Sequence, residues 1–99
     1  MRIYSVIQDN DLTEVAEVGD YDWEWSITGI YFQRSSGRFF AYSDAGCSCY
    51  FYGWDANSLS DLDEVTRAKA IELLKEQRGG TGMSDDGVQR EIAKVRDFR

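Results

Sequence analysis

Residues 22–43, with the sequence DWEWSITGIYFQRSSGRFFAYS, decide the fold of this chain. Trp23, Trp25 and Ile27 alternate with polar residues, which is the two-residue period of a half-buried strand. A second aromatic run, Arg38–Ser43, follows the short connection at residues 35–37, which ends in glycine. Two such runs joined by a short glycine-containing turn predict an antiparallel hairpin, and its aromatic content predicts that it forms the centre of the core.

Gly29 interrupts the alternation in the first strand. After it the apolar parity changes to Ile30 and Phe32, with Tyr31 on the opposite side. One interpretation is a β-bulge or twist at Gly29 that re-aims the second half of the strand. The other interpretation is a strand whose second half is buried on both faces.

Shorter elements are expected on either side of the hairpin. Arg2–Ile7 alternates and predicts a short strand. Leu12–Val18 fits neither period cleanly, so a short helical turn and a second strand both remain open for it. Asp44–Gly46 has the composition of a turn, and Cys47–Tyr52 is expected to form a further short strand.

Two helices are predicted after the strands. The first uses Ser60 as its N-cap and runs from Asp61 to about Arg78, before a glycine-rich connection at residues 79–83. Ser84 caps the second helix, whose apolar residues recur at helical spacing: Val88, Ile92 and Val95. The glycines before it leave three arrangements open, in which this helix docks on the sheet, projects away, or pairs with a partner.

Strands first and helices last is the order of an α+β domain. We expect a single domain over residues 1–99, with an antiparallel sheet of three to five strands and two C-terminal helices on one face. A chain of 99 residues with 42% hydrophobic content is sufficient for one packed core.

Charge and composition exclude several classes of partner. The formal net charge of -7 repels phosphate backbones, so direct binding of nucleic acid is not expected. The sequence has neither the long apolar run of a membrane span nor a signal-peptide pattern, so no membrane partner is expected. Two cysteines without an export signal fit a reducing cytoplasm.

The acidic residues concentrate before residue 23, where Arg2 is the single basic residue. One interpretation is a solvated surface that keeps the protein soluble, and the other is a patch that docks on a basic partner protein. Aromatic residues make up 14% of the chain, more than so small an interior hides, and exposed Trp and Tyr commonly anchor interfaces. The candidate partner-binding residues are therefore Asp9, Asp11, Glu14, Glu17, Asp20, Asp22 and Trp54.

The absence of histidine removes the usual catalytic triads and most zinc-hydrolase sites, so we expect no enzyme, no catalytic residues and no cofactor. Cys47 and Cys49 supply only half of a tetrahedral metal site and have no further Cys or His to complete it. We interpret them as small buried thiols near a turn, with a thiol or metal site as the alternative. The glycines at 79–82 follow a predicted helix and lack the Gly-Lys-Ser/Thr ending, which indicates a hinge instead of a phosphate loop.

The segment at residues 39–49, FFAYSDAGCSC, is followed by aromatic residues and by Leu59-Ser-Asp-Leu62. It resembles small uncharacterised proteins of actinobacteriophages and their actinobacterial hosts that share an Asp-x-Gly-Cys-Ser-Cys segment. The resemblance extends over residues 21–74 and implies a small phage accessory gene, without assigning any activity or binding residue.

The functional hypothesis combines this origin with the acidic N-terminal block, the surplus aromatics and the missing catalytic groups. It is a non-enzymatic phage accessory protein that binds and modulates a host protein in the host cytoplasm, in host takeover or defence inhibition. A Cys47/Cys49 thiol or metal protein and a virion or assembly component are the alternatives.

Overall fold

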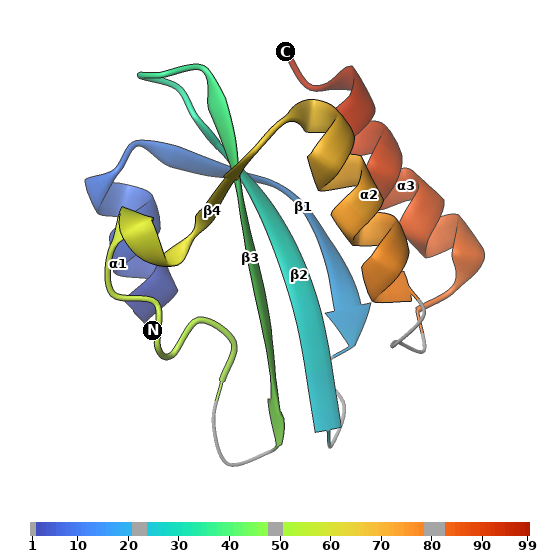
Figure 1. Ribbon diagram of the computed structural model, residues 1–99. Coiled ribbons are helices and arrows are strands. Elements are labelled where there is room, and N and C mark those ends of the chain that lie inside the picture. The colour runs from blue at the N-terminus through green and yellow to red at the C-terminus, as the bar shows by residue number, and fades with distance from the viewer. Residues whose placement is uncertain (1, 21–23, 48–50, 79–82) are drawn as a thin grey trace.

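The computed structural model describes residues 2–20, 24–47, 51–78 and 83–99 (Figure 1). Its sheet has four antiparallel strands in the order β1-β2-β3-β4, which confirms the predicted α+β class. In chain order the elements are α1 (Arg2–Asp9), β1 (Leu12–Asp20), β2 (Glu24–Gln33), β3 (Arg38–Cys47), a 3-10 helix η1 (Leu59–Asp61), β4 (Asp63–Val65), α2 (Arg67–Arg78) and α3 (Asp85–Asp97).

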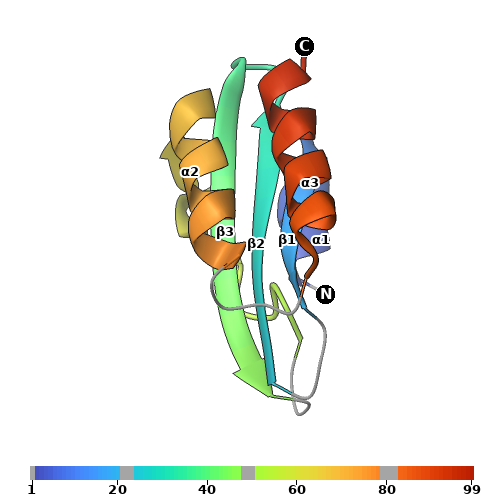
Figure 2. The same ribbon diagram turned by 90° about the vertical axis from the view of Figure 1, so that its right-hand side faces the viewer.

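Helices cover both faces of the sheet. In Figure 2, α2 and α3 lie in front of the strands and α1 lies behind them. The two C-terminal helices share one face, as predicted, and bury Ala70, Leu74 and Val88 against strand residues such as Ile30. On the opposite face, Ile3 and Val6 of α1 pack with a second cluster: Leu12, Tyr31, Phe40, Ala56 and Leu62. The sheet is therefore the middle layer of three.

The β2–β3 hairpin forms where it was predicted, and its register runs without a shift from Glu24↔Cys47 to Gln33↔Arg38. The prediction of a bulge at Gly29 is wrong, because Gly29 pairs with Tyr42 in regular register. The alternative interpretation is the correct one, since every residue from Ile27 to Tyr31 is buried. The bulge lies instead in β1, where the register shifts between Glu14 and Ala16.

The predicted N-terminal strand at Arg2–Ile7 is wrong, because this segment is the helix α1. The two-residue alternation of Ile3 and Ile7 coincides with a helical pattern in which Ile3, Val6 and Ile7 stand at i, i+3 and i+4. Burial follows the helical pattern, with Ile3 and Val6 buried and Ile7 half-buried. The ambiguous segment that follows is a strand, β1.

The segment between β3 and α2 differs most from the prediction. The expected turn at Asp44–Gly46 is wrong, because β3 continues through it to Cys47. Residues 48–50, the centre of the expected strand at Cys47–Tyr52, lie outside the described residues, and Phe51 and Tyr52 are not in a strand.

The first predicted helix begins six residues later than expected. Leu62 packs on the α1 side of the sheet, whereas Val65 packs on the α2 and α3 side. Residues three apart in a helix share a face, so these two opposed positions require the extended β4. The helix α2 then begins at Arg67, where the Thr66 hydroxyl accepts a hydrogen bond from the backbone N–H of Lys69 at 3.0 Å.

The last helix agrees with its sequence signals. The Ser84 hydroxyl caps α3 by accepting a hydrogen bond from the Gly87 N–H at 3.1 Å, and Val88, Ile92 and Val95 are buried. Of the three arrangements left open, α3 docks on the sheet.

Arg67 at the start of α2 holds the end of α3. Its guanidinium donates to the carbonyls of Val95 at 2.6 Å and Phe98 at 2.7 Å, and it lies 5.0 Å from the centroid of the Phe39 ring. The last carbonyls of a helix have no partner within the helix, so a cation that binds them satisfies orphaned acceptors. This contact ties both covering helices to the sheet.

We predict that Arg67→Ala lowers the free energy of unfolding by about 1 to 2 kcal/mol, because charged hydrogen bonds to the α3 terminus are lost. Urea titration followed by circular dichroism measures the change. The control is Lys69→Ala, whose exposed contact to Glu72 spans 3.8 Å and whose loss should change stability by less than about 0.5 kcal/mol. Equal effects of the two variants would contradict the proposed role of Arg67.

Candidate functional site

The bulge in β1 brings two carboxylates to one face of the sheet. In a regular strand, side chains three residues apart point to opposite faces. Here the register shift between Glu14 and Ala16 adds one residue, so that Glu14 pairs with Tyr31 and Glu17 pairs with Gly29. Tyr31 and the position of Gly29 both face α1, and Glu14 and Glu17 therefore both lie on the α1 side of the edge strand.

A chain of tyrosine hydroxyls lies beside this carboxylate pair. The Tyr31 and Tyr52 hydroxyls are 2.9 Å apart, and the Tyr52 hydroxyl donates to the carbonyl of Tyr42 at 3.1 Å. Because the Tyr52 proton is used on that carbonyl, the Tyr31 hydroxyl donates to Tyr52. Gly29 makes room for the pair, since a Cβ there would stand 2.5 Å from the Tyr52 oxygen and 2.7 Å from the Tyr31 oxygen.

The carboxylates and hydroxyls line a small cavity of about 30 Å³ between α1 and the sheet. Its walls come from α1, β1, β2 and the segment after β3: Ile3, Tyr4, Ile7, Glu14, Glu17, Tyr31 and Tyr52. This volume accommodates a group of the size of a water molecule. The cavity is polar on the β1 side and apolar on the α1 side.

Electrostatics of the cavity favour retained protons. Partial burial raises the pKa of Glu14. The charge of Glu17, a hydrogen bond from Glu17 and the charge of Glu91 raise this pKa further, whereas the charge of Lys94 lowers it. Burial likewise raises the pKa of Tyr31 well above its usual value, so its hydroxyl stays protonated at physiological pH. Glu91 on α3 also accepts the Glu17 N–H at 2.9 Å and pairs with Lys94 at 2.5 Å.

Three large aromatic side chains are exposed on α1 and on the segment that follows β3. Tyr4 is 58% exposed, Phe51 is 56% exposed and Trp54 is 47% exposed, and the last two rings stack with centroids 5.9 Å apart. The backbone joins the two segments, because the Ile3 N–H donates to the Gly53 carbonyl at 3.2 Å. Gly53 has φ +79°, and a Cβ there would stand 2.4 Å from the Ile3 side chain, so only glycine permits this approach.

We call this surface the α1 face and define it by Tyr4, Phe51, Trp54, Glu14 and Glu17. It combines exposed aromatics from two segments with the carboxylate pair of β1. Sequence reasoning missed Tyr4 and Phe51. Tyr4 was hidden by the incorrect strand prediction, and a helical reading would have placed it off the buried face of Ile3 and Val6.

The structure separates the predicted acidic residues into three groups. Asp9 and Asp11 are exposed at the turn between α1 and β1, and Asp11 has a positive φ of 56°. The α1 face holds Glu14 and Glu17, while the backbone of Asp20 ends β1, about 30 Å from Asp11 at the usual rise per strand residue. Asp22 lies outside the described residues. These acids form a line along the sheet edge instead of a single patch.

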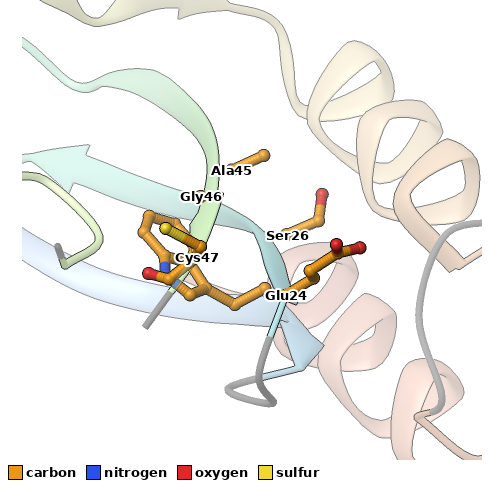
Figure 3. Close-up of a pocket in the computed structure, with 6 residues that line it drawn as sticks. Glu24, Ser26, Ala45, Gly46 and Cys47 are labelled. Carbon is orange, nitrogen blue, oxygen red and sulfur yellow. The ribbon is translucent and has the colours of Figure 1, made fainter. Parts of the chain in front are cut away.

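Cys47 is exposed, so its prediction as a buried thiol is wrong. It ends β3 and lines a shallow hollow of about 390 Å³ with Glu24, Trp25, Ser26, Ala45 and Gly46 (Figure 3). In Figure 3 the Cys47 sulfur and the Glu24 carboxylate point away from each other. Cys49 lies outside the described residues, and the described part of the chain contains no group of three or more His, Cys, Asp or Glu arranged to hold a metal ion.

The sequence matches the family described as Domain of unknown function (DUF7574) over residues 1–98. The chain belongs to this family. Neither a curated protein nor a solved structure matches it. Among the described residues, no helix is both long and apolar enough to cross a membrane. The DUF7574 match spans the residues of the α1 face together with the whole sheet.

We predict unequal effects for the two buried hydroxyls. Tyr52→Phe removes the hydroxyl that donates to the Tyr42 carbonyl and accepts from Tyr31, and it should lower stability by about 1 to 3 kcal/mol. Tyr31→Phe removes one donor and should lower it by about 0.5 to 1.5 kcal/mol. Urea unfolding measures both, with Tyr4→Phe as the exposed control. A larger loss for Tyr31→Phe than for Tyr52→Phe would refute the donor order.

A second prediction concerns pH. A carboxyl whose pKa is raised by folding adds stability below its unfolded pKa, and this contribution is lost as pH rises through the raised folded pKa. Glu14→Gln should therefore be more stable than the parent protein at neutral pH, with the advantage vanishing in acid. Urea unfolding over a pH series tests this, with the exposed Asp55→Asn as the matched control. If Glu14→Gln were more stable than the parent protein by the same amount at every pH, ionisation of the Glu14 carboxyl would be excluded as the source of the difference.

Proposed function

We propose that the protein is a small non-enzymatic phage accessory protein that binds and modulates a host protein, with the α1 face as its docking surface. The observation that carries the proposal is the stacked Phe51–Trp54 pair, which is exposed together with Tyr4 on a domain whose other large apolar side chains among the described residues are buried or partly buried. Trp and Tyr are enriched among the residues that dominate interface energies.

The charge of the α1 face specifies the kind of partner. Glu14 and Glu17 line the same cavity as Tyr4, and the formal net charge of the chain is -7. Opposite charge on the partner would speed encounter and select against acidic surfaces. We therefore propose a partner with a basic surface, of the kind that host takeover or defence inhibition would engage in the host cytoplasm.

The phage origin rests on the resemblance of residues 21–74 to actinobacteriophage proteins, and family membership agrees with an uncharacterised group. The alternative of a Cys47/Cys49 site has less support in the geometry. Cys47 is exposed, but the Glu24 carboxylate that lines the same hollow points away from its sulfur in Figure 3. The α1 face instead gathers aromatic and acidic groups from three segments, α1, β1 and the segment after β3.

The proposal predicts that immobilised protein captures a basic protein from actinobacterial lysate, and that Phe51→Ala with Trp54→Ala weakens the purified complex at least about tenfold. Mass spectrometry identifies the partner and titration calorimetry measures the affinity. Glu14→Lys with Glu17→Lys should weaken it as well.

The matched control reverses two charges on the far side of the sheet, Glu72→Lys with Glu76→Lys on the exposed side of α2. This pair should leave the affinity unchanged at constant salt. Affinity that is indifferent to Phe51 and Trp54, or equally sensitive to both charge reversals, would overturn the α1 face as the docking surface.

A further inference from the structure

We propose that Glu91 of α3 guards the open edge of the sheet and keeps β1 from pairing with the β1 strand of a second copy of this chain. The inference goes beyond the docking function and does not rest on it, because it concerns the sheet edge and not the exposed aromatics. It gives a role to one contact, the hydrogen bond from the Glu17 N–H to the Glu91 carboxylate.

The two edges of the sheet differ in how much backbone they offer to a further strand. The order β1-β2-β3-β4 leaves β1 and β4 at the edges. β4 has three residues, of which Asp63 and Glu64 are exposed, and edge strands that are short and charged pair poorly with other chains. β1 has nine residues and is long enough to accept a further strand. The β1 edge therefore needs protection of another kind.

The backbone of Glu17 faces away from the sheet. In an antiparallel pair, successive residues direct their N–H and C=O groups alternately toward the partner strand and away from it. Glu17 stands opposite Gly29 of β2, yet its N–H donates to the Glu91 carboxylate at 2.9 Å. Glu17 thus carries its backbone donor where an added strand would bind, and the regular register up to Asp20 gives Gly19 the same direction.

Glu91 is held in place for this bond. Its side chain is 14% exposed, and its other carboxylate oxygen pairs with Lys94. The next residue, Ile92, belongs to the same core cluster as Ala16 and Val18 of β1, which fixes α3 alongside the edge (Figure 2). A carboxylate that accepts a backbone N–H forms a charge-assisted hydrogen bond, and an incoming strand must displace this bond before it can pair at Glu17.

The rest of β1 opposes pairing with a second copy through its shape and charge. The register shift between Glu14 and Ala16 interrupts the regular ladder. Two β1 strands side by side would also bring the glutamates of both copies together, and like charges on neighbouring strands repel each other. A second copy is nevertheless the occupant that fits this edge, because a two-fold axis lets one strand offer donors and acceptors to its own duplicate. Loss of the guard should therefore produce a dimer, most readily at high salt.

The test measures self-association of Glu91 variants by analytical ultracentrifugation at high salt, after circular dichroism has shown that each variant is folded. Glu91→Ala removes the acceptor, and Glu91→Asp keeps the charge but shortens the side chain. Both should associate at least about tenfold more strongly than the parent protein. Glu91→Gln keeps a side-chain oxygen at the same reach and should associate no more than the parent. Glu76→Ala removes an exposed glutamate from α2 and is the matched control.

The position of the new contact is tested by ¹H–¹⁵N NMR, in which association should shift the amides of β1. Association of Glu91→Ala and Glu91→Asp at the level of the parent, or increased association of Glu91→Gln, would overturn the guard. Association that disappears when Phe51→Ala and Trp54→Ala are added to Glu91→Ala would overturn it as well, since the contact would then run through the aromatics.

Amide exchange of the parent protein keeps the proposal testable if a variant does not fold. The Glu17 N–H should exchange at least about tenfold more slowly than in an unstructured peptide, although it lies on the open edge. Unprotected exchange would overturn the hydrogen bond on which the guard rests. Capture of a basic partner by the parent protein tests the docking function separately, so either idea can fail while the other stands.

Discussion

Burial of the β2–β3 hairpin on both faces is the constraint on which the other elements depend. Residues Ile27–Tyr31 have no solvent-facing side, so the sheet needs a cover above and below. The helices α2 and α3 supply one cover, and α1 with the segment around η1 supplies the other. A helix of eight residues is not stable alone in water, so α1 depends on packing of Ile3 and Val6 against this sheet.

The sequence predicts the elements whose local signals agree with their tertiary roles. The hairpin around Gly37 and the capped helix α3 are of this kind, since alternation, turn chemistry and capping all indicate the same structure. The boundary of α2 could not be predicted because Leu62 and Val65 fit a helical face equally well, and only the position of the sheet assigns them to opposite sides. For α1, a segment of eight residues satisfies both periods, and the tertiary contact of Ile3 decides between them.

The candidate site was only partly predictable for a related reason. The sequence identifies Glu14 and Glu17 as acidic, but on a regular strand they would face opposite sides. Their pairing requires the bulge in β1, for which the sequence has no distinct signal, because the extra residue Val15 is apolar and buried like Ala16 and Val18. Gly29 was predicted to mark a bulge, but its role is different. Because glycine has no side chain, this position leaves room for the hydroxyls of two tyrosines.

The two faces of the sheet therefore differ in chemistry for a structural reason. On the α2 and α3 side, side-chain contacts such as the Gln77 bonds to Ser26 and Thr28 close the layer against the strands. On the α1 side, a single short helix covers less of the sheet, which leaves exposed aromatics, a water-sized cavity and a paired set of carboxylates. Glu14 and Glu17 stand on a strand that pairs with the hairpin, and Tyr4 stands on a helix that packs against the sheet, so these groups are held in place by the fold itself. A surface that needs little ordering on binding retains more of its contact energy as affinity, and this is the physical reason why we propose the α1 face as the docking surface.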